Sequence, residues 1–269
     1  MPNAWPGSVA PTRHSAAVGE QPVSWLEREG ADPPVLLLHG WGASASTFTG
    51  LMRLCRTRRR ILAPDLPGFG QSPQGETLWT TSGYADLVRE MVRLRGWSQI
   101  SLVGHSYGGS VSIRLAGEPG VTVDRLVLCD ASGVRFPNRG VVGARVRVFR
   151  ALRASAEAVL PGRAAESAVE WLRQRMGSAD YRAAGALRPT LVHAVQEDLS
   201  GTAARISVPT LIVWGARDQE LPLDPYGLRL RQLITSSELV EFESSGHFPF
   251  VDEPGRFAAV LDSFVDATL

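Results

Sequence analysis

The sequence predicts an α/β fold, in which a mostly parallel sheet carries helices on both faces. Strand-like and helical segments alternate along most of the 269 residues, and this alternation is typical of parallel strands joined by helical crossovers. Several of the strand-like segments are unbroken apolar runs, as in strands that are buried on both faces. The chain is long enough for one large domain of this class, with room for an insertion.

The first half of the chain supplies four predicted strands and two predicted helices. The strands are expected at residues 23–29, 35–38, 60–63 and 100–103. Apolar residues at helical spacing predict a helix over 84–95, and a second helix includes 111–116. The carboxyl ends of parallel strands form the ligand crevice in such sheets, so the loops that follow these strands are where a functional site is expected.

The second half resumes the alternation after an interruption. Strands are predicted at 125–129, 208–214 and 238–242, and an amphipathic helix at 257–265 closes the chain. Residues 134–204 are rich in alanine and arginine and contain three candidate helices, at 141–160, 164–176 and 187–198. We interpret this segment as an inserted helical lid, with helices that merely cover the sheet as the alternative. The core then comprises 21–133 and 205–269, and the Pro- and Gly-rich residues 1–20 form a flexible lead-in.

Composition excludes several classes of function. Hydrophobic residues make up 44% of the chain and charged residues 20%, which fits a globular protein with a substantial core. The formal net charge is +1, so neither nucleic acid nor an anionic membrane is expected as an obligate partner. The two cysteines, Cys55 and Cys129, form no disulfide framework. No metal-ligand cluster of Cys and His is visible, and no metal or cofactor is expected.

The sequence contains no segment typical of a secreted or membrane-spanning protein. The N-terminal residues lack the basic start and apolar stretch of a secretory signal. No apolar run approaches the ~20 residues that cross a bilayer. A cytoplasmic protein is therefore expected, and its oligomeric state is open.

The run Gly-His-Ser-Tyr-Gly at residues 104–108 is the most informative motif. It follows the predicted strand at 100–103 and precedes a helical stretch, which is the setting of a G-x-S-x-G nucleophile elbow. Such a turn strains the backbone of its serine, and the flanking glycines leave room that a Cβ would fill. We therefore expect Ser106 to be a nucleophile at the positive end of a helix. An ordinary strand-to-helix turn is the alternative.

A serine hydroxyl needs a positioned base, normally a histidine held by a carboxylate. In enzymes with such an elbow, the acid and then the histidine follow the serine along the chain. His247 is the predicted base, because it lies in a loop after the last predicted strand, between Gly246 and Pro249. An exposed loop histidine is the alternative. The remaining histidines precede the serine or fall within a predicted helix: His14, His39, His105 and His193.

The predicted acid is Asp218, which follows the strand at 208–213 and a glycine, Gly215, that permits a turn. A helix N-cap or turn aspartate is the alternative interpretation. Asp130 also ends a predicted strand and is the reserve candidate for the acid. Asp224 is less suitable, because it is too close to the following helix.

A tetrahedral oxyanion needs two backbone N–H donors. One is expected from Tyr107, the residue after the nucleophile. The other is expected from Trp41, because Gly40 and Gly42 on either side let this loop turn its amide toward the site. A plain glycine turn is the alternative. The Trp41 side chain is then expected to bind substrate.

With these residues assembled, the chain resembles the serine hydrolases of the α/β-hydrolase superfamily that carry a helical lid. The resemblance extends from about residue 23 to the C-terminus and is carried by the motifs His39-Gly40-Trp41-Gly42, Asp65-Leu66-Pro67-Gly68-Phe69-Gly70-Gln71-Ser72, Gly104-His105-Ser106-Tyr107-Gly108-Gly109, Trp214-Gly215-Ala216-Arg217-Asp218 and Gly246-His247.

The resemblance implies an α/β-hydrolase fold without a cofactor. It implies Ser106 as nucleophile, Asp218 as acid and His247 as base, and it makes Asp65 a structural aspartate that orders its loop. A serine at the nucleophile position argues against haloalkane dehalogenases and epoxide hydrolases, which use aspartate there.

Three functions follow from these residues. The first is hydrolysis of a small, largely apolar ester through an acyl-enzyme. The second uses the same triad for carbon–carbon bond cleavage, acyl transfer, elimination or perhydrolysis of a biosynthetic intermediate. The third is a receptor that retains the fold and binds a small ligand without catalysis, since a fold alone does not determine function.

Overall fold

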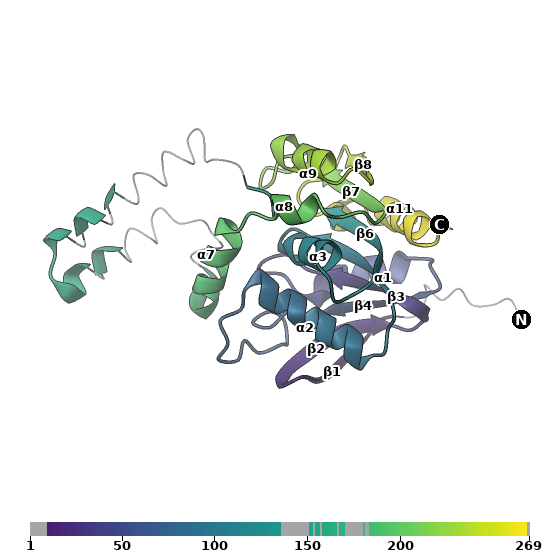
Figure 1. The fold of residues 1–269 in the computed structure, drawn as a ribbon, viewed down its shortest axis with the longest axis horizontal. Coiled ribbons are helices and arrows are strands. Elements are labelled where there is room, and N and C mark those ends of the chain that lie inside the picture. The colour runs from purple at the N-terminus through teal and green to yellow at the C-terminus, as the bar shows by residue number, and fades with distance from the viewer. Residues whose placement is uncertain are drawn as a thin grey trace, which may run out of the picture.

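The computed structural model describes residues 10–135, 151–152, 154–156, 158–165, 167–169, 180 and 183–267. Within these residues, one sheet has the strand order β1-β2-β4-β3-β5-β6-β7-β8 (Figure 1). The strands are β1 (Thr12–Val18), β2 (Gln21–Arg28), β3 (Ala31–Leu38), β4 (Arg59–Pro64), β5 (Ile100–His105), β6 (Val123–Cys129), β7 (Thr210–Gly215) and β8 (Ser237–Phe242).

The pairing of the strands confirms the predicted sheet. β2 is antiparallel to both β1 and β4, whereas all pairs from β4 through β3, β5, β6 and β7 to β8 are parallel. Each strand predicted from the sequence lies within or overlaps one of the observed strands. The carboxyl ends of β3, β5, β6, β7 and β8 therefore meet at one edge, where a crevice is expected.

Helices cover both faces of the sheet (Figure 1). The described helices are α1 (Thr49–Leu54), α2 (Thr81–Leu94), α3 (Tyr107–Gly117), α7 (Arg188–Gln196), α8 (Ser200–Ala203), α9 (Leu228–Leu233), α10 (Pro249–Asp252) and α11 (Pro254–Val265), with short helical turns η2 (Ala45–Phe48), η3 (Gly185–Leu187) and η4 (Leu223–Gly227). None of these described helices has both the length and the apolar character needed to cross a bilayer.

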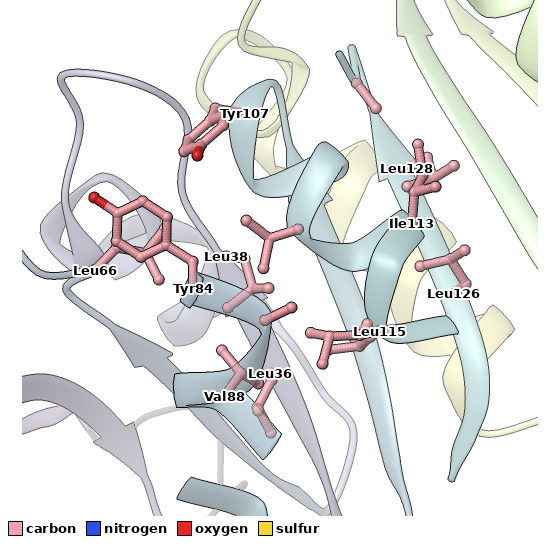
Figure 2. Packing of buried hydrophobic residues seen from close by; sticks show 14 of the residues in the cluster. Leu36, Leu38, Leu66, Tyr84, Val88, Tyr107, Ile113, Leu115, Leu126 and Leu128 are labelled. Carbon is pink, nitrogen blue, oxygen red and sulfur yellow. The ribbon is translucent and has the colours of Figure 1, made fainter. Parts of the chain in front are cut away.

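Side chains that alternate between the two faces of the sheet form two apolar cores. Leu36 and Leu38 of β3 belong to the cluster that α2 and α3 cover, and Figure 2 shows them with Leu126 and Leu128 of β6. Val35 and Leu37 belong to the opposite cluster, together with residues of α1, α10 and α11. Successive side chains of a strand point to opposite faces, so an unbroken apolar run is what a sheet covered on both sides requires.

The flexible lead-in predicted for residues 1–20 is wrong for Thr12–Val18, which form β1. This strand pairs with β2 over seven residue pairs at the edge of the sheet. Most of its side chains are exposed, so its sequence lacks the apolar pattern of a buried strand, and pairing with its neighbour determines its conformation. Residues 1–9 lie outside the described part of the chain.

The helical insertion expected at 134–204 is described only in part. Helical residues occur within 151–169, and α7 falls inside the helix predicted at 187–198. Much of the predicted helices at 141–160 and 164–176 lies outside the described residues. Among the described residues of the insertion there is no strand. Leu187, just before α7, packs against Gly68 in the loop that follows β4.

Candidate active site

Ser106 occupies the sharp turn between β5 and α3. Its φ of 50° lies in the left-handed region, which among the described non-glycine residues is shared only with Asp130. Backbone hydrogen bonds hold this strained conformation: the Ser106 N–H donates to the Cys129 carbonyl (3.1 Å), and its own carbonyl accepts from the Ser132 N–H (3.0 Å). The side chain remains partly exposed. Strain of this kind persists where the surrounding structure imposes it.

Close packing at the elbow requires glycine. A Cβ on Gly108 would lie 2.1 Å from the carbonyl oxygen of Leu38, at the end of β3. That oxygen belongs to the backbone of a buried strand and cannot move aside easily. The elbow therefore packs directly on the end of the neighbouring strand, and this brings the loop after β3 to the serine.

His247 and Asp218 meet in a buried hydrogen bond. The Nδ1 atom of His247 lies 2.7 Å from Oδ2 of Asp218, and both residues are at most 9% exposed. The other oxygen, Oδ1, accepts the backbone N–H groups of Glu220 (2.8 Å) and Leu221 (3.0 Å). Burial alone would raise the pKa of Asp218, but the hydrogen bonds from His247 and Leu221 outweigh it and lower this pKa. An ionised Asp218 accepts the Nδ1 proton, which leaves Nε2 as the basic nitrogen.

His105 holds the backbone of His247 beside the elbow. Its Nε2–H donates to the His247 carbonyl at 2.8 Å, and the two imidazole rings lie 4.9 Å apart. Burial, together with the nearby His247, lowers the pKa of His105 to about 3, so its ring is neutral. Sequence reasoning treated His105 only as a member of the motif and missed this contact. The one available signal was a histidine directly before the serine.

The hydroxyl of Ser106 makes no hydrogen bond to His247 or to any other described residue. The Nε2 atom of His247 lies 3.7 Å from Oε2 of Glu220, an exposed carboxylate at the rim. Catalytic hydrogen bonds are often long in enzymes without substrate and tighten when substrate binds. The structure thus joins Asp218 to His247 and holds the His247 backbone beside the elbow, but it does not join His247 to the hydroxyl.

The loop after β3 lies against the nucleophile. A Cβ on Gly40 would be 2.9 Å from Cβ of Ser106. In the described part of the chain, neither the Trp41 N–H nor the Tyr107 N–H has a hydrogen-bond acceptor. The Trp41 indole packs edge-on against Phe69 (5.1 Å between ring centroids) and Tyr107 (5.8 Å). Trp41 and Tyr107, whose N–H groups are the predicted oxyanion donors, thus lie in one aromatic cluster with Phe69.

His39 and Asp65 order the loops around the site. His39 is buried, which lowers its pKa; its Nε2 accepts the Leu66 N–H (3.0 Å), and its Nδ1 lies 2.8 Å from the Gly40 carbonyl. The wholly buried carboxylate of Asp65 accepts the N–H groups of Ala45 (2.7 Å) and Gln71 (2.9 Å). Neither side chain is hydrogen-bonded to Ser106.

Asp130, the reserve acid, lies close to the Asp218–His247 pair. Its Oδ1 accepts the Gly215 N–H at 2.9 Å, and it makes no hydrogen bond to His247. Single atoms of Asp130, Asp218 and His247 lie within 4.8 Å of one another, an arrangement that can in principle bind a metal ion. His247 Nδ1 and Asp218 Oδ2 are instead hydrogen-bonded to each other, and this favours acid–base chemistry.

Comparison with known proteins adds to this geometry. The sequence profile of the alpha/beta hydrolase family matches residues 35–260. A pimeloyl-[acyl-carrier protein] methyl ester esterase of Aeromonas hydrophila is 27% identical over 89% of this chain and 98% of its own length. A 2-hydroxymuconate semialdehyde hydrolase of Pseudomonas putida is 28% identical over 89% of each chain. The crystal structure of a bacterial membrane phospholipase A superposes with a TM-score of 0.74 at 25% identity, over 97% of this chain and 87% of that one.

Proposed function

The chain belongs to the alpha/beta hydrolase family, and from this premise we propose that it is a serine hydrolase that cleaves a small, largely apolar carboxylic ester. The observation that carries the proposal is the buried hydrogen bond between His247 and Asp218 (2.7 Å) beside a serine with a strained, left-handed backbone. A histidine oriented by an ionised carboxylate is what activation of a serine hydroxyl requires.

In the proposed reaction the Ser106 oxygen attacks the ester carbonyl carbon while Nε2 of His247 accepts the hydroxyl proton. Asp218 stabilises the imidazolium that forms. The negative oxygen of the tetrahedral intermediate accepts hydrogen bonds from the N–H groups of Trp41 and Tyr107. The imidazolium then returns the proton to the departing alcohol, and an acyl-enzyme remains. Water attacks this acyl group with His247 as base, and the carboxylic acid leaves Ser106 free.

Two features support an apolar substrate. Trp41 is partly exposed and packs on the buried rings of Phe69 and Tyr107, so that the residues of the proposed oxyanion donors belong to one aromatic cluster. Residues 134–204 are proposed as a lid, inserted in the sequence between the two ranges that form the core, 21–133 and 205–269. The contact of Leu187 with Gly68 supports this proposal, because it brings the start of α7 onto the loop that carries Phe69. An apolar acyl or alcohol group is then enclosed between the lid and the partly exposed Trp41 of this cluster.

A second candidate is hydrolysis of a carbon–carbon bond by the same residues. It is favoured by the similarity to a 2-hydroxymuconate semialdehyde hydrolase over 89% of this chain. The methyl ester esterase, with similar identity, favours ester hydrolysis, so the family alone does not separate the two. A non-catalytic receptor is the third candidate, and the Asp218–His247 hydrogen bond argues against it.

A fluorophosphonate probe distinguishes the enzymes from the receptor. We expect it to label the folded protein at Ser106, identified by mass spectrometry of the tryptic peptide, and Ser106→Ala to abolish labelling. Ser98→Ala, which changes an exposed serine between α2 and β5, is the matched control and is expected to be labelled normally. Asp218→Asn is expected to slow turnover by roughly 10⁴-fold, because His247 is left in the wrong tautomer. Absence of labelling in folded wild-type protein would refute a serine hydrolase.

A substrate panel separates the two enzymatic candidates. p-Nitrophenyl esters with acyl chains from acetate to dodecanoate test ester hydrolysis, and 2-hydroxymuconate semialdehyde tests carbon–carbon cleavage. Turnover of the esters, lost in Ser106→Ala, is the expected result. Labelling of Ser106 without turnover of any ester, together with turnover of the semialdehyde, would establish the second candidate instead.

A further inference from the structure

Asp130 is the second strained residue of the described chain, and the mechanism above does not use it. It follows β6 with a φ of 43°, and it is wholly buried. Its backbone N–H donates to the Val213 carbonyl (3.0 Å), and its Oδ1 accepts the Gly215 N–H (2.9 Å). These two bonds attach it to the end of β7, directly beneath the turn that carries Asp218. Backbone strain at a buried residue is often retained for function, and Asp130 lies beside the Asp218–His247 pair.

The ionisation of the Asp130 carboxyl is coupled to that of Asp218. One oxygen of Asp130 lies within 4.8 Å of an oxygen of Asp218 and of a ring nitrogen of His247. Two buried carboxyl groups this close do not both ionise, because the second negative charge would face the first in a medium of low polarity. One of the two therefore holds a proton.

The hydrogen bonds decide which carboxyl holds it. Asp218 accepts two backbone N–H groups and the Nδ1 proton of His247, and these donors favour its ionised form. Asp130 accepts one backbone N–H and the weak donor Cys129 Sγ, at 3.2 Å. Burial raises the pKa of Asp130 to about 9, against the opposing effects of the Gly215 N–H and the Cys129 thiol. The titratable groups facing it are Cys129, Asp218 and His247.

We propose that Asp130 is a positioning residue: a neutral carboxylic acid that shares its proton with Asp218 and so holds the Asp218 carboxylate against His247. This role rests on the proposed function, since it acts through the Asp218–His247 pair. It differs from the role of reserve acid considered from the sequence. A neutral carboxyl donates a hydrogen bond and carries no charge, whereas the acid of a triad must be ionised.

Replacement by asparagine, alanine and glycine tests the proposal. The asparagine amide can still donate to Asp218 while its oxygen accepts the Gly215 N–H, and asparagine tolerates a positive φ. Alanine removes both interactions. Asp130→Gly accommodates the backbone and replaces the alanine variant if that variant does not fold. Asp86→Asn, at an exposed position of α2, is the matched control. Urea unfolding establishes first that each full-length variant is folded.

The measurement is the rate of Ser106 labelling by a fluorophosphonate between pH 6 and the onset of unfolding. At pH 7 we expect Asp130→Ala to label about 10- to 100-fold more slowly than wild type, as for loss of a hydrogen bond to a charged group. Asp130→Asn is expected to restore the rate to within about threefold. Wild type and Asp86→Asn are expected to lose reactivity as pH rises through about 9, and Asp130→Asn is expected to lack this decline.

An infrared difference spectrum provides a readout that is independent of catalysis. Wild type minus Asp130→Asn in D₂O at pH 7 is expected to contain the carbonyl band of a protonated carboxyl, and its absence would overturn the proposal. A pH profile of Asp130→Asn identical to wild type would also overturn it. If Asp130→Asn is labelled far more slowly than wild type while Asp218→Asn is labelled at the wild-type rate, Asp130 is the acid of the triad. If wild-type protein is not labelled at all, the proposed function fails, while the infrared band still decides where the proton lies.

Discussion

The carboxylate of Asp65 offers the clearest test of how the loops around the site are held. It is wholly buried after β4 and accepts three hydrogen bonds: from the N–H groups of Ala45 (2.7 Å) and Gln71 (2.9 Å) and from the guanidinium of Arg13 (2.7 Å). These partners come from the turn η2, the loop after β4 and the edge strand β1. One side chain thus connects three segments that are far apart in the sequence.

The loss of unfolding free energy in Asp65→Ala depends on whether water can replace the carboxylate as acceptor for each of the three donors. The Ala45 N–H is buried and would be left without an acceptor, which costs about 1–3 kcal/mol. Gln71 is exposed and Arg13 is 24% exposed, so water replaces much of what they lose, and together they add about 1 kcal/mol. The expected loss is therefore about 3 kcal/mol of unfolding free energy, or roughly 6–12 °C in Tm for a domain of this size.

Urea denaturation at pH 7 measures this loss, with Asp86→Ala as the matched control. Asp86 is 67% exposed and pairs only with Arg89 among the described residues, so its replacement is expected to change stability by less than about 0.5 kcal/mol. Asp65→Asn keeps one acceptor oxygen and is expected to fall between Asp65→Ala and wild type. A loss below about 1 kcal/mol for Asp65→Ala would refute the reasoning, because it would mean that the carboxylate does not hold these loops.

Three further predictions concern packing, pH and the thiols. A Cβ at Gly215 would lie 1.9 Å from the Gly246 carbonyl oxygen, so Gly215→Ala should displace the Asp218 and His247 loops and abolish fluorophosphonate labelling. Gly50→Ala, where a Cβ meets open space in α1, should instead stabilise by about 0.5–1 kcal/mol in urea; equal behaviour of the two variants would contradict the packing argument. Asp130 is protonated when folded up to a pKa of about 9 but ionises near 3.8 when unfolded, so unfolding releases a proton between these values and stability falls as pH rises. Relative to Asp130→Asn, wild type should lose up to about 1.4 kcal/mol per pH unit in this window, and parallel stability curves would exclude a neutral Asp130. Cys55 and Cys129 are fully buried, which raises both thiol pKa values, so a disulfide reagent should modify them only after unfolding; rapid reaction of either thiol in native protein would contradict this.

The sequence by itself determined the architecture and the candidate residues, because the signals for both are local. An apolar run that enters Gly-His-Ser-Tyr-Gly predicts a strand, a tight turn and a helix, and β5, Ser106 and α3 follow this order. β1 was missed, because its exposed edge position carries no apolar pattern and only pairing with β2 makes it a strand.

Only the tertiary structure distinguished residues whose local contexts are alike. Asp130 and Asp218 both follow a parallel strand. Yet Asp218 is hydrogen-bonded to His247, whereas Asp130 accepts the Gly215 N–H. His105 contacts a carbonyl 142 residues away, which no spacing rule reveals. The Ser106 hydroxyl is expected from the sequence to be hydrogen-bonded to His247, and the described residues contain no such bond. These outcomes depend on how strand ends and loops pack in three dimensions, because hydrogen bonds and burial act between neighbours in space, whereas sequence patterns report neighbours along the chain.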